Sequence, residues 1–524
     1  MALRLLALTG LTAAAAAVTP QRRKNVLFVI SDDLRPELPC YGCDHVLAPR
    51  TTALAKESIT FTRAYAQQAL CAPSRNSFLS GRRPAHTKSW QFVDDFREVG
   101  PDWTTLPGAF RKAGYQAVGC GKIFHPGLPP NQDLPYSWDR RMNTTWADWN
   151  NPNEPRCPQN TSWCSVEDTE RFQDTQIAST ALELLTNVTR DERPFFLAVG
   201  FRKPHVQWRA PTRAFDAYPP WNVSLASRPK GPQHSVDVAF HVPVHEIDVF
   251  TDWRACGGSQ ALTPAHNYPS ECQQAWRRGY YAAVTFVDEQ LGVVLDGLTA
   301  RNRERDTVVV FFGDHGWHLG DQGEWMKMTN YENAVRVPLL VRVPWAPESA
   351  GRVVSAPVEL VDLFPTLAGL AGVDVSYTSR ESQPLDGRDL SPLFFGGAGD
   401  DTHVARSVYP RCVANASAAW KHNDCNDTPR RRFSHMGYST RDERWRFTAW
   451  YEWSHLRLAP KGSPVAVELY DHAGDTGTCD GAGGSALEDY EWANVAGDHA
   501  SVVEAQLARL ERLFGIDAPI VDLY

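Results

Sequence analysis

Short, uncharged apolar runs alternate with segments of helical periodicity along most of the chain. Four of these runs, rich in β-branched and aromatic residues, begin at Asn25, Tyr115, Pro194 and Thr307. Such continuous runs are typical of strands buried on both faces of a parallel sheet. Helical periodicity appears at residues 175–188, 279–298 and 358–373. The pattern therefore predicts an α/β fold with a large, mixed but mostly parallel sheet that is flanked by helices.

The pattern changes after residue 395. Residues 395–401 form a Gly/Asp linker, and residues 435–453 are typical of an aromatic-rich antiparallel hairpin with an Asp/Glu turn. An amphipathic helix is expected near the carboxyl end of the chain. We therefore predict a main domain over residues 24–395 and a smaller C-terminal α+β domain, containing an antiparallel sheet, over residues 402–524.

The first residues are typical of a secretory signal peptide. Arg4 precedes an apolar run from Leu5 to Val18 that ends in small residues, so we expect residues 1–19 to be removed. This run is too short to span a bilayer comfortably, and no apolar run near twenty residues follows it, so no stable membrane insertion is expected. Six N-x-[ST] sites agree with export and predict a glycoprotein: Asn143, Asn160, Asn187, Asn222, Asn415 and Asn426.

Net charge and cysteine count restrict the partners of the protein and the uses of its cysteines. The 53 basic and 61 acidic residues give a net charge of −8, which disfavours nucleic acid or an anionic membrane as a general partner. The 11 cysteines are an odd number, so in an oxidising compartment at least one is committed to something other than a disulfide. Cys157 with Cys164, and Cys412 with Cys425, are the natural candidates for local bridges.

Polar side chains follow each of the four apolar runs. Because the carboxyl ends of parallel strands meet at one edge of a sheet, these groups are expected to share a site there. The groups that follow the runs are Asp32 and Asp33, Lys122 and His125, His205, and Asp314 and His315.

Three of these groups are carboxylates that would repel one another in a buried cleft. Asp32, Asp33 and Asp314 can lie together when a cation neutralises them, and an oxygen-rich site suits calcium or magnesium better than zinc. His315 stands beside them as a further ligand. For Asp32 and Asp33 alone, a loop start or a helix cap is the alternative interpretation.

Cationic and imidazole groups are expected at the same edge. Arg75, Lys122, His125, His205 and Lys327 next to a bound divalent cation would favour an anionic ligand. A tetrahedral oxyanion such as sulfate or phosphate fits this combination.

The segment CAPSR at residues 71–75, followed by NSFLSG, resembles the C-x-P-S-R signature of the type I sulfatases. Further blocks, among them GKIFHPG, PFFLAVGFRKPH and GDHGWHLGDQGEWMK, extend the similarity over nearly the whole mature chain. Within the family, His after Asp314 and FHPG after Lys122 resemble the branch that acts on 2-O-sulfated uronic acids. The resemblance implies an alkaline-phosphatase-like sulfatase fold.

The resemblance also implies a modified residue and a cofactor. Cys71 would be converted to formylglycine by the formylglycine-generating enzyme, which would account for the odd cysteine. One Ca²⁺, with Mg²⁺ as the alternative, would be held by Asp32, Asp33, Asp314, His315 and the modified residue 71.

The remaining polar groups would act on the substrate. Arg75 and Lys122 would stabilise the hydrated aldehyde, while His125, His205 and Lys327 would contact the sulfate. One hydroxyl of the hydrate would attack sulfur, and deprotonation of the other, by His125, would expel sulfate. Either Lys327 or His205 would protonate the leaving oxygen.

The implied substrate is a 2-O-sulfated uronic acid at the end of a glycosaminoglycan, in a lysosome-like compartment. A sulfated extracellular polysaccharide is the alternative substrate. A phosphate or phosphonate monoester hydrolase of the same superfamily, or a non-catalytic protein that binds sulfated glycans, are the alternative functions.

Overall fold

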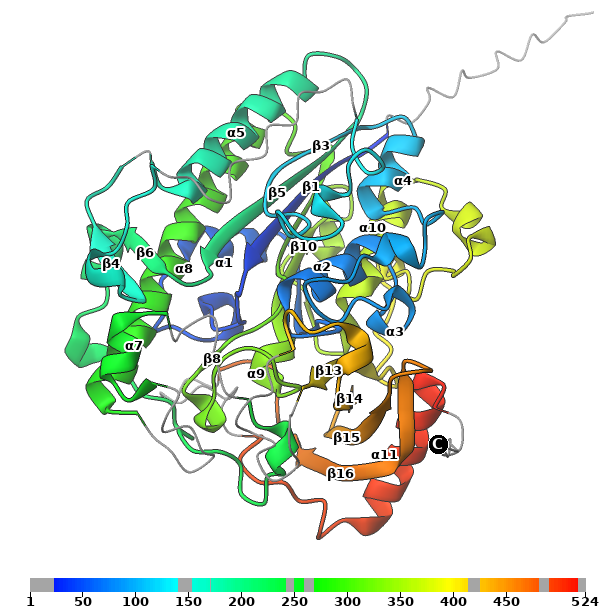
Figure 1. Ribbon diagram of the computed structural model, residues 1–524. Coiled ribbons are helices and arrows are strands. Elements are labelled where there is room, and N and C mark those ends of the chain that lie inside the picture. The colour runs from blue at the N-terminus through cyan, green and yellow to red at the C-terminus, as the bar shows by residue number, and fades with distance from the viewer. Residues whose placement is uncertain are drawn as a thin grey trace, which may run out of the picture.

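An eight-stranded sheet forms the centre of the protein in the computed structural model (Figure 1). The structure describes residues 23–139, 153–169, 171–241, 249–258, 268–412, 425–479 and 490–516. Seven strands follow one another in the order β11-β2-β10-β7-β1-β5-β3, and β12 pairs with β2. Their bounds are β1 Asn25–Asp32, β2 Ile59–Tyr65, β3 Gln116–Gly121, β5 Phe195–Pro204, β7 Thr307–Gly313, β10 Arg336–Arg342, β11 Val353–Val354 and β12 Val358–Glu359.

The four apolar runs of the sequence become four adjacent strands. β1 pairs in parallel with β5 on one side and β7 on the other, and β3 pairs in parallel with β5. β10 is antiparallel to both β7 and β2, which makes the sheet mixed. The predicted large, mostly parallel sheet is therefore confirmed.

Helices cover both faces of the sheet, which explains why its strands carry no polar alternation. Along β1, Val26, Phe28 and Ile30 face one apolar core, whereas Leu27 and Val29 face the other. In Figure 1 α1, α5 and α8 lie on one side of the sheet and α2, α4 and α10 on the other. Their bounds are α1 Pro49–Lys56, α2 Cys71–Ser80, α4 Leu106–Lys112, α5 Gln173–Val188, α8 Ser270–Thr299 and α10 Leu363–Ala371.

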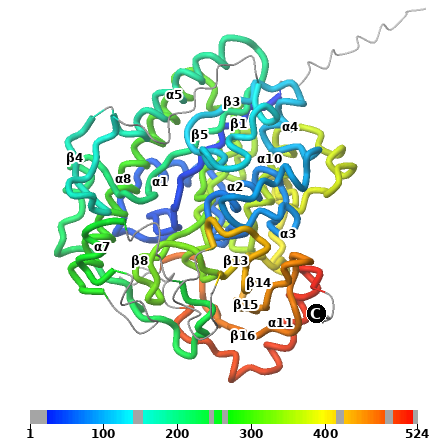
Figure 2. Tube along the Cα trace, in the orientation of Figure 1, coloured from blue at the N-terminus to red at the C-terminus, as the bar shows by residue number. Residues whose placement is uncertain are grey.

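A second, four-stranded antiparallel sheet lies at the C-terminal end, in the order β13-β14-β15-β16. Figure 2 shows this orange and red part of the chain beside the blue helices near the amino terminus. Helix α11 packs against it through Leu510, with Val503, Leu507 and Phe514 partly buried beside it. The bounds are β13 Ala405–Arg411, β14 His435–Arg441, β15 Trp445–Ser454, β16 Ala459–Asp471 and α11 Ala500–Phe514. The predicted hairpin and helix are confirmed, whereas the division into domains at residues 395 and 402 stays a prediction.

Several short elements complete the fold. They border the sheets and the loops around the carboxyl ends of the strands. Their bounds are β4 Trp163–Val166, β6 Trp208–Pro211, β8 His318–Leu319, β9 Trp325–Met326, α3 Pro84–Thr87, α6 Thr212–Asp216, α7 Thr251–Ala255 and α9 Glu332–Val335.

Disulfides join segments that are both near and distant in sequence. The two predicted local bridges, Cys157–Cys164 and Cys412–Cys425, are present, and Cys256–Cys272 is a third. The fourth, Cys43–Cys479, connects the loop after β1 to the segment after β16. Cys40, Cys71 and Cys120 are free thiols.

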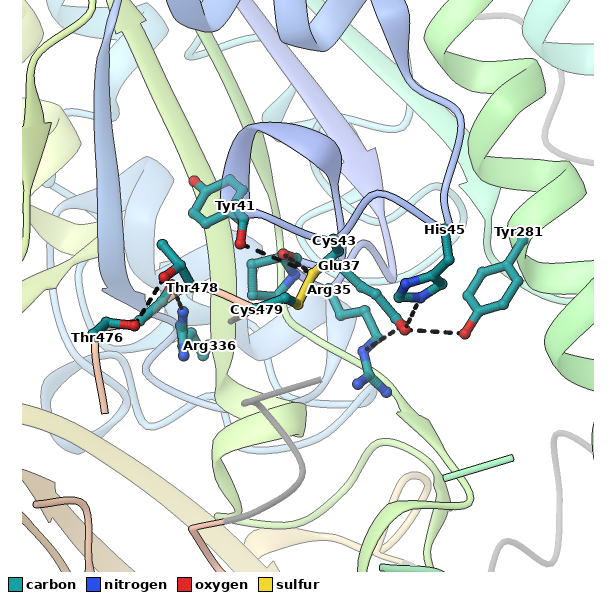
Figure 3. Close-up of a disulfide and its surroundings, with 12 residues drawn as sticks. Arg35, Glu37, Tyr41, Cys43, His45, Tyr281, Arg336, Thr476, Thr478 and Cys479 are labelled. Atoms are coloured by element: carbon teal, nitrogen blue, oxygen red, sulfur yellow. Dashed lines mark hydrogen bonds and ion pairs between the residues drawn. A yellow bond between two sulfur atoms is a disulfide. The ribbon is translucent and has the colours of Figure 1, made fainter. Parts of the chain in front are cut away.

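Figure 3 shows the surroundings of the long-range bridge. Near the bridge, Glu37 is buried and accepts hydrogen bonds from His45 Nε2 at 2.6 Å and from Tyr281 OH at 3.0 Å. Arg35 Nε lies 3.1 Å from the same carboxylate. These contacts fix the loop between β1 and Cys43 against α8.

No helix within the described ranges is long and apolar enough to cross a bilayer. The predicted signal peptide, at residues 1–19, and two of the predicted glycosylation sites, Asn143 and Asn415, lie outside the described residues.

Candidate active site

The polar groups that follow β1, β3, β5 and β7 meet at one edge of the sheet, as the sequence predicts. Asp32 ends β1 and Asp33 follows it, Lys122 follows β3, and Asp314 and His315 follow β7. All five side chains are buried. His205, after β5, approaches the same place, with its Nε2 4.0 Å from Asp33 Oδ2.

Cys71 is the first residue of helix α2, so its side chain lies at the positive end of a helix dipole. Its Sγ is 3.4 Å from Asp32 Oδ1, 3.2 Å from His315 Nε2 and 3.3 Å from Lys327 Nζ. A helix amino terminus with adjacent cations suits an anionic ligand. The arrangement therefore places the Cys71 side chain between acidic and basic groups.

Each buried carboxylate of this edge has a cation beside it. Lys122 Nζ lies 2.6 Å from Asp32 Oδ2, and Lys327 Nζ lies 2.9 Å from Asp33 Oδ1. The Lys327 ammonium also lies 5.3 Å from the centre of the Trp317 ring. Buried charges persist only when they are paired in this way.

Arg75 connects the ends of three strands. Its Nε donates to Asp314 Oδ2 at 2.9 Å and its Nη2 donates to Asp32 Oδ1 at 3.1 Å. Its Nη1 donates to the carbonyls of Lys122 and Ile123. This guanidinium, one turn after Cys71 on α2, thus fixes the carboxylates of β1 and β7 and the chain after β3 in one arrangement.

The environment shifts the pKa values of these acids in opposite directions. Burial acts to raise the pKa of Asp32, but Lys122 and Arg75 outweigh it and hold that pKa well below its usual value. Burial raises the pKa of Asp314 to about 6 despite the attraction of Arg75. Burial, and then the charge of Asp32, raise the pKa of the Cys71 thiol well above its usual value. A buried, neutral thiol is a poor nucleophile, because the thiolate is the reactive form.

Three histidines present the same ring nitrogen to the site. In His125, His205 and His315, Nδ1 lies 3.0, 2.5 and 3.0 Å, respectively, from the carbonyl oxygen of the residue that follows. Burial lowers the pKa of all three rings well below the usual value. A neutral ring that donates through Nδ1 carries its lone pair on Nε2, which can accept a proton or bind a metal.

Two glycines allow the strands to approach closely where Lys122 begins its turn. A Cβ at Gly200 would lie 1.9 Å from the Lys122 carbonyl oxygen, and one at Gly121, where φ is +73°, would lie 2.1 Å from the Gly200 oxygen. The Lys122 N–H donates to that same Gly200 oxygen at 2.8 Å. Any larger residue at either position would move Lys122 away from Asp32.

Four of the buried groups could hold a metal ion together. Ligand atoms of Asp32, Asp33, Cys71 and His315 all lie within 4.8 Å of one another. Asp314 touches this group, since its Oδ1 accepts from the backbone N–H of Asp33 and of His315 at 3.0 Å each. Two carboxylates and an imidazole, with a further carboxylate adjacent, fit a divalent cation. If an oxygen replaces the sulfur of residue 71, the set fits a hard cation most closely.

Two residues near the site were not predicted from the sequence. Lys203 is buried and its Nζ donates to the carbonyl oxygens of His205 and Gln207, within the turn that carries His205. The Phe92 ring lies 5.4 Å from the His125 ring, and both side chains are partly exposed. The KPH segment could have indicated Lys203, whereas nothing in the sequence around Phe92 points to His125.

Comparison with known proteins identifies the family. The sulfatase family model matches residues 24–373. This chain belongs to the sulfatase family. Iduronate 2-sulfatase of Mus musculus is 34% identical to it over 505 residues, and that of Homo sapiens is 35% identical over 498 residues. Each alignment covers 85% of this sulfatase and 88% of the relative.

Solved structures share the fold at lower identity. Phosphonate monoester hydrolase from Silicibacter pomeroyi superposes with a TM-score of 0.68 at 23% identity, covering 94% of this sulfatase and 95% of that chain. A protein solved in complex with its substrate D-glucosamine-2-N,6-O-disulfate gives a TM-score of 0.66 at 20% identity, covering 95% and 99%. The sulfatase is a sulfuric ester hydrolase, and the predicted family, fold class and reaction class are confirmed.

Proposed function

We propose that this sulfatase removes the 2-O-sulfate group from a terminal uronic acid of a glycosaminoglycan or a related sulfated polysaccharide. The observation that carries the proposal is Cys71 itself, which lies at the amino end of α2 between the carboxylates and Lys327. The similarity to two iduronate 2-sulfatases over 85% of the chain supports the choice of sugar.

In this proposal Cys71 is converted to formylglycine, and its Sγ marks the place of the hydroxyl oxygens of the hydrated aldehyde. The hydrate supplies one hydroxyl that attacks sulfur and a second whose deprotonation releases sulfate. A bound Ca²⁺, or Mg²⁺, would be held by Asp32, Asp33, Asp314 and His315 and would add positive charge opposite the sulfate.

The side chains of the site would divide the remaining work. Arg75 holds the carboxylates in place, and the Lys122 ammonium stabilises negative charge at residue 71. His125 Nε2, with its proton on Nδ1, accepts the proton of the second hydroxyl. Either Lys327 or His205 donates a proton to the leaving sugar oxygen, and Lys327 Nζ also lies 3.3 Å from the Cys71 sulfur. His205 contacts the sulfate.

The proposed route of the enzyme is the secretory pathway, with a lysosome-like compartment as its destination and the extracellular space as the alternative. Four disulfides support an oxidising compartment during folding. Residues 24–395 would form the catalytic domain and residues 402–524 the smaller α+β domain.

The test combines chemistry at residue 71 with a choice of substrates. Protein from a host that makes formylglycine should show an aldehyde or its hydrate at residue 71 by peptide mass spectrometry. It should release sulfate from a disaccharide with a terminal 2-O-sulfated uronic acid, and the Cys71→Ala variant should release none. An unmodified thiol in active protein would refute the mechanism. Faster turnover of a phosphonate monoester than of any sulfated sugar would instead favour the phosphonate hydrolase alternative.

A further inference from the structure

Two short segments run side by side from His125, a partly exposed residue of the candidate active site, to an exposed turn of the chain. Phe92, whose ring packs on His125, donates its backbone N–H to the Asn426 carbonyl at 2.8 Å. A second contact joins the other ends of the segments, four residues before Phe92 and four residues after Asn426. There Arg430 Nη1 donates to the Lys88 carbonyl at 3.0 Å. We call residues 88–92 and 426–430 the ledge. Its outer surface is formed by the residues that are at least partly exposed, among them Lys88, Phe92, Asp427 and Pro429, whereas Ser89, Trp90, Gln91 and the predicted glycosylation site Asn426 are buried. Since an extended residue spans about 3.3–3.6 Å, the ledge reaches at most about 14 Å from Phe92.

The outer end of the ledge carries three consecutive arginines, residues 430–432, which we call the arginine turn. It is a 3₁₀ turn in which Arg432 N–H donates to the Pro429 carbonyl at 2.7 Å. Trp453 Nε1 donates to the Arg430 carbonyl at 2.9 Å, and the next residue, Phe433, is fully buried. The turn is therefore held by the C-terminal sheet and does not depend on a ligand for its shape.

The charges of this turn are only partly compensated. Arg430 is 20% exposed and lies 3.4 Å from both Asp94 and Glu98. Arg431 and Arg432 are exposed, and among the residues that the structure describes neither forms an ion pair. Arg431 Nη1 donates only to the His455 carbonyl, at 3.1 Å.

Adjacent like charges repel, weakly so when they are exposed to water, and a bound anion would relieve this repulsion. The cluster is also unusual for its setting, since the protein as a whole carries a net charge of −8. Guanidinium groups match the oxygens of sulfate in both charge and geometry.

We propose that the arginine turn is a second binding site for the substrate, which holds sulfate groups of the polysaccharide several sugars away from the bond that is cleaved. This inference rests on the proposed function in two respects, the polyanionic nature of the substrate and the place of its terminal sugar. The terminal sugar lies at His125, the following sugars run along the ledge, and Arg431 and Arg432 bind the sulfates beyond it. We therefore expect affinity to rise with chain length, because a longer chain can contact His125 and the arginine turn at the same time.

The experiment compares substrate lengths in an Arg431→Ser/Arg432→Ser variant. We expect KM for a heparin-derived decasaccharide to rise by about three- to tenfold, since each exposed charge pair contributes about 0.2–1 kcal/mol. The ratio of decasaccharide to disaccharide KM should rise by the same factor. Elution from a heparin column should shift to lower salt, because exposed charge pairs are screened.

An Arg193→Ser/Arg305→Ser variant is the matched control. It removes the same charge at the amino ends of β5 and β7, on the opposite edge of the sheet, and should leave both KM values and the elution unchanged. An Arg431→Lys/Arg432→Lys variant keeps the charge and checks that the turn still folds. Retention by the heparin column does not require catalysis, so it tests the site even if no sulfated sugar is hydrolysed.

Two results would overturn the inference. One is that the serine variant keeps both its decasaccharide KM and its retention on the heparin column, or that the control variant changes in KM and retention as much as the serine variant does. The other is an equal loss of retention on phosphocellulose, which would assign the turn to anions in general and not to a sulfated glycan.

Discussion

At the scale of single residues, the three buried cations of the site differ in what they contact. Arg75 is fully committed to Asp32, Asp314 and the carbonyls after β3. The two lysines have different contacts, since Lys122 binds Asp32 Oδ2 whereas Lys327 lies beside both Asp33 Oδ1 and the Cys71 sulfur. The arginine therefore fixes the carboxylates, and Lys327 is a cation in direct contact with residue 71.

Replacement of Lys122 by alanine should lower kcat by about 10²- to 10³-fold, the usual effect of removing one donor that stabilises developing negative charge. The fold should persist, because Arg75 still pairs with Asp32. Sulfate release and the thermal unfolding midpoint of Lys122→Ala are the measurements, with Lys56→Ala, an exposed lysine on α1, as the control. A kcat within a few-fold of the unchanged protein would contradict the role of Lys122.

Much of this residue-level arrangement could be predicted because strand-end position is visible in the sequence. Asp32, Lys122, His205 and Asp314 each follow an apolar run, and parallel strands bring such ends together. The packing of Phe92 on His125 could not be predicted, because the two residues are brought together by loops whose course depends on tertiary contacts.

At the scale of elements, the end of β5 and the turn after it are held from three sides. The Asp174 carboxylate, in the first turn of α5, accepts from the backbone N–H of Arg202 at 2.6 Å and of Lys203 at 3.0 Å. Ser31 Oγ donates to the Lys203 carbonyl at 2.7 Å. The Lys203 ammonium then closes the turn by donating to the carbonyl of His205. A buried lysine thus acts as an internal support for the histidine.

The Lys203→Met variant should therefore lower kcat about tenfold or more with little change in KM, because small displacements of a contacting group have large effects on rate. The measurement is a double-mutant cycle with His205→Ala. If Lys203 acts by positioning His205, the double variant has the kcat of His205→Ala alone. Independent, multiplying losses would show that Lys203 has a different, purely structural role.

The strands themselves were predictable to within a few residues, since continuous apolar runs have few other interpretations. The order of the strands in the sheet was not, because pairing partners depend on where crossover helices pack. The antiparallel insertion of β10 between β7 and β2 is an example. The sequence of β10, an ordinary apolar run, carries no sign of its direction.

At the scale of the whole molecule, a buried acid lies where the loop between β8 and β9 faces the C-terminal sheet. Glu324 Oε1 accepts from the His241 backbone N–H at 2.8 Å. Burial raises the pKa of Glu324 to about 8; Arg411 opposes the shift and Glu468 adds to it. The carboxyl is thus neutral in the folded protein at pH values where it is ionised in the unfolded chain.

The raised pKa of Glu324 adds a contribution to stability that is present in acid and lost as pH rises. Between about pH 4.5 and pH 8 this carboxyl binds a proton in the folded state that it has released in the unfolded state, so its contribution to the free energy of unfolding falls as pH rises through this window. In Glu324→Gln that dependence should be lost, and the variant should gain on the order of 4 kcal/mol relative to the unchanged protein between pH 5 and pH 8. Denaturant unfolding at both pH values measures this, with the exposed Glu504→Gln as control. Parallel pH dependence in all three proteins would contradict the prediction.

The bridge between Cys43 and Cys479 spans 436 residues of sequence. Most of the polypeptide is therefore a single covalent ring, from which residues 1–42 and 480–524 extend. A protease that cuts once anywhere between these two cysteines opens the ring but releases nothing, since both fragments stay attached through sulfur. On a gel such a nicked enzyme would migrate as one species until a reductant is added. The two disulfide-linked chains that then separate would both be products of one gene.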